Sequence, residues 1–213
     1  MKTIKFLTAL TLVTGIGSIQ AQDFNDTNQD SHTITITVPE VALLDIVGAD
    51  GEEASADIGF DLDANAAYNI TEAGEGFDFS SAVNSSLWVN YTSVMPNAGV
   101  ASRKITVGID NQTNVPGGLK ITLTTPQLNA DNGDEGNLIG SFSQDWTDTS
   151  GPVFGVDPAD VVTGIGSVYT GEGAGKGLNL RYQLSEDGTA NSFQDLEAGN
   201  YVATFIYTLA DVI

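Results

Sequence analysis

The glycine-rich stretch at residues 170–180, TGEGAGKGLNL, combines four glycines with a lysine, the residue types that cradle phosphate groups. A phosphate-binding loop has the spacing G-x-x-x-x-G-K-S/T. Here Thr170 stands in place of the first glycine, and Gly177 stands in place of the hydroxyl residue that would bind magnesium. A dinucleotide-binding fingerprint fails as well, because Lys176 occupies the position of its last glycine.

The segment after these glycines decides between a nucleotide site and a turn. Nucleotide-binding loops hold phosphate at the N-terminus of a helix. Residues 178–184 (LNLRYQL) instead alternate with a period of two, which is typical of a strand. The sequence therefore predicts that the glycines turn the chain between a strand at residues 168–169 and another that begins at Leu178.

Oxygen-bearing side chains gather in residues 131–137, DNGDEGN. Carboxylate and amide oxygens are the ligands that calcium prefers, and a flexible loop lets them converge. The segment does not follow the EF-hand pattern, because Gly133 stands at its third position. Two interpretations remain, a solvated turn and a calcium site, and apart from this calcium we expect no cofactor. The ligands would be Asp131, Asp134, Glu135 and Asn137.

The 28 acidic residues provide many carboxylate pairs of the kind that glycoside hydrolysis requires. In a chain this acidic, pairs also arise by chance, and most of them fall in loops without the burial that tunes a general acid. His32 is the only histidine, and there is no cysteine. These counts exclude a zinc site with two histidines and a cysteine nucleophile. His32 also lies too near the start of the chain for a Ser-His-Asp triad, so we expect no enzyme.

Two tryptophans are candidates for stacking on sugar rings. Trp146 lies in a polar stretch, SQDWTDTSG, and we predict that it is exposed and is a glycan-stacking residue. Trp88 lies within an apolar run, LWVNY, and we expect it in the core.

The formal net charge of −21 is large for 213 residues. Nucleic acids and anionic membranes bind basic patches, so neither is an expected partner. Residues 1–21 combine two lysines, an apolar run and a small-residue exit at Ala21, the pattern of a secretory signal peptide. We therefore expect export across the inner membrane to the cell surface or medium, with no membrane span after cleavage. We expect residues 22–31 to form a polar and flexible tail.

Short alternating segments recur along the rest of the chain, separated by Gly, Asn, Asp and Pro. No window has a helical period of useful length. Residues 41–47 are a further apolar run. The expected strands are residues 32–38, 58–62, 87–91, 104–109, 119–124, 138–142, 161–162, 168–169, 178–184 and 201–212. We therefore predict an all-β, antiparallel β-sandwich of about 8–10 short strands that forms a single domain over residues 32–213.

Two segments carry a resemblance to a known family. Residues 196–209, LEAGNYVATFIYTL, resemble the closing segment of secreted pilin and spore-coat-U-like surface subunits. The alternating Ile34, Ile36 and Val38 resemble the donor strand of chaperone–usher pilins, although this chain lacks the cysteine pair that many such subunits carry. The resemblance implies an immunoglobulin-like sandwich, export through a Gram-negative envelope, and a structural role without catalysis.

The sequence therefore favours an exported, non-catalytic structural or adhesive surface protein, and a fimbrial subunit is one form of it. Its partners would be further copies of the chain or neighbouring surface subunits. Residues 33–38 would then complete the sheet of a neighbour, or else form the first strand of their own sandwich. The alternatives are a glycan-binding module and a two-carboxylate glycoside hydrolase.

Overall fold

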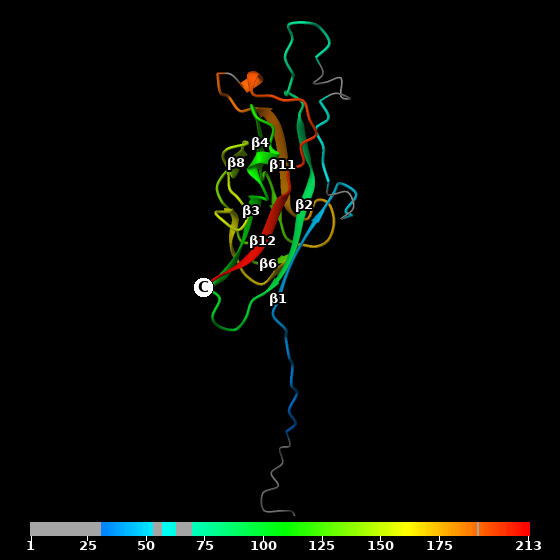
Figure 1. Ribbon diagram of the computed structural model, residues 1–213. Helices are drawn as coiled ribbons and strands as arrows, with labels where there is room; N and C mark the ends of the chain where they lie inside the picture. The colour runs from blue at the N-terminus through cyan, green and yellow to red at the C-terminus, as the bar shows by residue number, and fades with distance from the viewer. Residues whose placement is uncertain (1–30, 53–56, 63–69, 191) are drawn as a thin grey trace, which may run out of the picture. The chain divides into compact units, whose positions relative to one another are not determined.

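The computed structural model describes residues 31–52, 57–62, 70–190 and 192–213 (Figure 1). The predicted signal peptide and nearly all of the predicted polar tail therefore lie outside the described residues. A compact unit runs from Pro39 to Ile213, and residues 1–38 form a separate unit. Within the described ranges, the only helical elements are two short 3₁₀ turns, η2 (Gln112–Asn114) and η3 (Ser192–Gln194). None of the described helices has the length and hydropathy needed to cross a membrane.

The compact unit is a sandwich of two antiparallel sheets, which confirms the predicted β-sandwich. The larger sheet has the order β6-β10-β2-β11-β4-β8. β1 pairs with the edge of β2 that lies opposite β10 and β11, and β5 pairs with β11. Its strands are β1 (Val41–Val47), β2 (Val83–Val94), β4 (Leu119–Thr124), β5 (Leu128–Asn129), β6 (Asn132–Gly133), β8 (Ser143–Trp146), β10 (Val168–Tyr169) and β11 (Gly177–Glu186).

The smaller sheet has the order β12-β3-β9-β7. Its strands are β3 (Ser102–Ile109), β7 (Asn137–Leu138), β9 (Ala159–Ile165) and β12 (Phe205–Val212). β3 and β9 are the inner strands: the register of β3 with β12 covers all eight residues of β3, and its other edge pairs with β9. The last strand of the chain therefore pairs with one that lies about a hundred residues earlier.

Alternation along the strands builds the core. Leu87, Val89 and Tyr91 point inward from β2, and Ile105, Val107 and Ile109 point inward from β3; all six are buried. Removing this apolar surface from water is the main favourable term that holds the two sheets together.

The predicted strand at residues 32–38 is wrong for the described structure, because residues 31–40 carry no strand. Residues 58–62 also lack a strand, although Ile58 and Phe60 pack against the core. The last strand begins at Phe205 rather than at residue 201. Alternation indicates that a segment can form a strand, but a partner strand is needed to make one.

Candidate functional site

The segment that carries the predicted assembly residues is exposed. The exposed fractions of Ile34, Ile36 and Val38 are 74%, 81% and 70%. The side chains of successive residues in an extended chain point to opposite sides, so these three can share one face while Thr33, Thr35 and Thr37 share the other. A single described copy therefore leaves an apolar stripe of strand-forming residues in water.

Two strands of the sandwich have an unpaired edge on the same side of the molecule. In the part of the chain that the structure describes, β1 pairs only with β2, and β12 pairs only with β3. β1 and β12 lie next to each other without pairing (Figure 1). An edge of this kind presents free backbone N–H and C=O groups, which can pair with an added strand.

The side chains on these two edges are mostly apolar. Leu43 on β1 is 64% exposed, while Leu44, Ile46, Phe205 and Leu209 pack against the core and remain partly exposed. Edge strands are usually protected by lysine, proline or short length. Neither β1 nor β12 contains a lysine or a proline, and each has one acid, Asp45 and Asp211 respectively.

Arg103 joins the two sheets at the end where β1 begins and β12 ends. Its side chain is 1% exposed. Nε donates to Asp211 Oδ1 at 2.8 Å, and Nη2 donates to Glu40 Oε1. Nη1 donates to Ser93 Oγ at 3.0 Å, to Val94 O at 3.3 Å and to Val41 O. The guanidinium thus bonds to residues of β1, β2 and β12 and to the residue that precedes β1.

The sequence reading missed Arg103 although a signal was present. The residue stands in the same alternation as Ile105 and Val107, so it points inward from β3. A buried guanidinium is stable only when its charge and donors are matched. An arginine at an inward position therefore predicts nearby acids, which Glu40 and Asp211 supply from distant parts of the chain.

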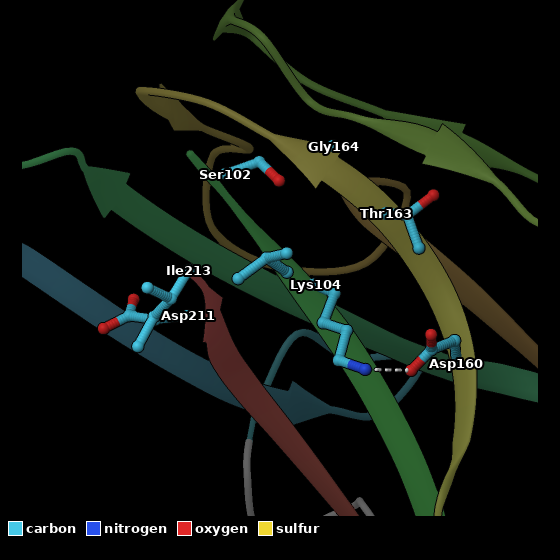
Figure 2. Close-up of a pocket in the computed structure, with 8 residues that line it drawn as sticks. Ser102, Lys104, Asp160, Thr163, Gly164, Asp211 and Ile213 are labelled. Atoms are coloured by element: carbon cyan, nitrogen blue, oxygen red, sulfur yellow. Dashed lines mark ion pairs between the residues drawn. The ribbon is translucent and has the colours of Figure 1, made fainter. Parts of the chain in front are cut away.

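A hollow of about 490 Å³ lies on β3, β9 and β12 (Figure 2). It is lined by Ser102, Lys104, Asp160, Thr163, Gly164, Asp211, Val212 and Ile213. Lys104 Nζ lies 2.7 Å from Asp160 Oδ1, and Asp211 is paired with Arg103. Both carboxylates of the hollow are therefore engaged in ion pairs, and no aromatic side chain lines it to stack on a sugar.

The predicted calcium ligands each interact with a different part of the protein. Asp131 forms an ion pair with Lys176, while Asp134 Oδ1 accepts from Gly136 N at 3.4 Å. Asn137 begins β7, which pairs with β9. Within the described ranges, no group of three or more Asp, Glu, His or Cys side chains is arranged to hold a metal. The calcium site stays a prediction, in which Asn137 and backbone oxygens would have to complete the ligand set.

Glu135 lies beside a buried tyrosine. The hydroxyl of Tyr91 donates to the backbone oxygen of Glu135 at 2.6 Å. Burial raises the pKa of Tyr91, and the nearby carboxylates of Glu135 and Asp134 raise it further.

Trp146 is buried, so the prediction that it stacks on glycans is wrong. Its exposed fraction is 0%, and its ring meets that of Phe205 edge-on, with the two centroids 5.0 Å apart. Nε1 donates to Pro152 O at 2.8 Å, which satisfies the one polar group of the indole. The polar neighbours in sequence come from the outward positions of β8 and from the turn after it. Trp88, expected in the core, is half-buried at an outward position between Leu87 and Val89.

The glycine-rich stretch is a turn between β10 and β11, as predicted. Gly171, Gly173, Gly175 and Gly177 all have positive φ, so every second residue of the turn is left-handed. The side chain of Asn90 fixes it: Oδ1 accepts from Gly173 N at 2.7 Å, and Nδ2 donates to Lys176 O at 2.8 Å.

No protein-family model matches the chain. No curated protein and no solved structure matches it either.

Proposed function

We propose that this chain is an exported, non-catalytic structural or adhesive protein of the cell surface that assembles by donating residues 33–38 to a neighbouring subunit. The observation that carries the proposal is the exposure of Ile34, Ile36 and Val38. Three aliphatic side chains at alternate positions form a stripe that fits a sheet better than it fits water. The predicted signal peptide supports export, and the resemblance to pilin-like subunits supports a role in fibres.

The acceptor in this proposal is an unpaired edge of the sandwich, which β1 and β12 both offer within the described residues. Strand addition gains backbone hydrogen bonds along the edge, and alternate side chains find apolar neighbours there. Leu43 on β1 and Leu209 on β12 are such neighbours. Donation from one copy to the next is head-to-tail, and a head-to-tail contact that does not close generates filaments.

The other functions considered have less support. With Trp146 buried, the glycan-binding alternative loses the residue on which it was based. Asp160 and Asp211, the carboxylates of the hollow in Figure 2, each form an ion pair with a basic side chain. This pairing does not favour their use as the acid pair of a glycoside hydrolase. Our proposal therefore assigns no catalytic residue.

The test is a deletion of residues 22–38, followed by measurement of mass by light scattering and of folding by circular dichroism. We expect the full chain to assemble and the shortened chain to remain a folded monomer. The proposal is rejected if both forms are monomeric, or if the deletion unfolds a protein that was monomeric throughout.

A matched pair of variants separates the apolar stripe from the length of the segment. Replacing Ile34, Ile36 and Val38 by serine should abolish assembly, because it removes the face that an acceptor would bury. Replacing Thr33, Thr35 and Thr37 by serine changes the opposite face and should leave assembly intact. Equal loss in both variants would contradict a donated strand with one buried face.

A further inference from the structure

Four strand ends meet at one end of the sandwich. Val41 at the start of β1 is opposite Val94 at the end of β2, and Ser102 at the start of β3 is opposite Val212 at the end of β12. The first and the last strand of the compact unit therefore have their outer termini at the same end of the sandwich. Arg103 lies among these strand ends and bonds to Val41 on β1, Val94 on β2 and Asp211 on β12.

A pull on the two ends of the compact unit would load the terminal strands in their weakest direction. Ladder hydrogen bonds of antiparallel strands are perpendicular to the strands. When force pulls the start of β1 away from the end of β12, these bonds are loaded one after another and not together. Without a cross-link, β1 would peel from β2 and β12 would peel from β3.

We propose that Arg103 is a mechanical latch that holds the root of β1 to the end of β12 against tension on the chain ends. The guanidinium bonds to Glu40 and Val41 on one side and to Asp211 on the other, so neither terminal strand can leave before these bonds break. The guanidinium itself is shielded from water, since its side chain is 1% exposed, while the carboxylates of Glu40 and Asp211 are about half exposed. The latch is a property of a single domain and does not depend on assembly.

Lys104 provides a matched control on the same strand. Its ammonium pairs with Asp160 on β9, which is not a terminal strand (Figure 2). Removing Lys104 deletes an ion pair of the smaller sheet and leaves the bonds between the two chain ends in place.

The experiment measures the lifetime of single molecules under constant force in two pulling geometries. The chain contains no cysteine, so introduced cysteines give unique attachment points. One pair, at Thr33 and Ile213, loads the chain ends. The other pair, at Thr113 and Thr149, lies in turns at the opposite end of the sandwich. Lifetimes under force report the unfolding barrier rather than the equilibrium stability.

Arg103→Met should shorten the lifetime about tenfold or more when the chain ends are pulled, because it removes the buried guanidinium and with it the bonds to both terminal strands, which break early on this route. In the other geometry the latch is still intact at the barrier, so the lifetime should change little. Lys104→Met should change neither lifetime. Equal shortening in both geometries by Arg103→Met would overturn the latch, and so would an equal effect of Lys104→Met.

Glu40→Gln keeps the proposal testable if Arg103→Met does not fold. Glu40 has a half-exposed side chain, so its replacement leaves no buried charge of its own. The substitution weakens only the link between Arg103 and the residue before β1, because it replaces a charged acceptor by a neutral one. The same contrast between the two geometries is expected for this variant. A lifetime unchanged by Glu40→Gln when the chain ends are pulled would overturn the proposal.

Discussion

The hydroxyl oxygens of Tyr182 and Tyr207 lie 2.8 Å apart in the core, and each tyrosine comes from a different sheet. Both side chains are buried, with exposed fractions of 4% and 9%. The two hydroxyls bond to each other and form a second polar link between the sheets, besides the one that Arg103 makes. Phe205 packs on the ring of Tyr182, with the centroids 5.1 Å apart.

Tyr207→Phe should lower the free energy of unfolding by about 1–3 kcal/mol, because the hydroxyl of Tyr182 is left buried without its partner. The double variant Tyr182→Phe/Tyr207→Phe should cost less than the sum of the two single variants, since no unpaired hydroxyl remains. Urea unfolding of the four proteins gives this comparison. Additive losses would mean that the two hydroxyls do not depend on each other.

The same tyrosines should make the protein sensitive to alkali. Burial raises the pKa of Tyr182 and of Tyr207. The folded state then keeps its phenolic protons at a pH at which the unfolded chain releases them. The stabilisation that comes from these two protonated tyrosines is therefore fully present below about pH 10, the pKa of an exposed tyrosine. Above that pH, each tyrosine lowers the free energy of unfolding by about 1.4 kcal/mol for every pH unit. Urea unfolding between pH 9 and pH 11 measures the slope, which should be shallower in the double phenylalanine variant.

Trp146→Ala should lower the free energy of unfolding by about 3–5 kcal/mol, because it empties a fully buried site and removes the edge-on contact with Phe205. Val156→Ala is the comparison, since Val156 is 81% exposed and its loss should cost less than about 0.5 kcal/mol. Thermal unfolding followed by calorimetry measures both. A small effect at Trp146 would contradict its position in the core.

Two glycines of the turn between β10 and β11 differ in the space around them. Gly175 and Gly177 both have positive φ, but a Cβ at Gly177 would lie 2.0 Å from Val89 O, whereas one at Gly175 meets nothing within 4 Å. Gly175→Ala should cost about 1–2 kcal/mol for the left-handed backbone alone. Gly177→Ala should cost clearly more, because the backbone of β2 must move, and urea unfolding of both variants gives the ranking. Equal losses would show that only the backbone angle matters.

Calcium should raise the melting temperature if residues 131–137 bind it. A ligand that binds only the folded state adds about 2.7 kcal/mol when its concentration is a hundredfold above its dissociation constant. Magnesium at equal ionic strength is the control, because any divalent ion screens a chain with a net charge of −21. Asp134→Asn/Glu135→Gln should remove the difference between the two ions. A melting temperature that calcium does not raise above that in magnesium rules the site out.

Patterns of period two predicted much of the fold. β4 has the predicted bounds, β1 coincides with the apolar run noted at residues 41–47, and β3 and β11 were predicted to within two residues of each observed end. The turn chemistry of residues 170–177 was also predicted, since only glycine adopts positive φ so often without strain. These features are local, so a single sequence is enough to predict them.

The features that sequence missed depend on distant partners. Residues 33–38 alternate as well as any strand in the sandwich, but no strand is present there. Trp146 has polar neighbours along the chain, yet it is covered by Phe205, which lies about sixty residues later. Arg103 depends on Glu40 and Asp211, which lie near the first and the last residue of the compact unit in sequence. Burial and ion pairing of this kind are set by topology, which alternation does not encode.

The pairing of β12 with β3 determines when folding can finish. β3 is an inner strand of the smaller sheet, but one of its edges stays open until the last nine residues of the chain are available. A chain emerging N-terminus first from a ribosome can build β1 against β2 early, while one edge of β3 waits for β12. Such late closure gives a high contact order and slow folding, and it leaves apolar edges open for the whole of that time. The interval before the C-terminus emerges is therefore the period in which this protein is most exposed to aggregation and proteolysis.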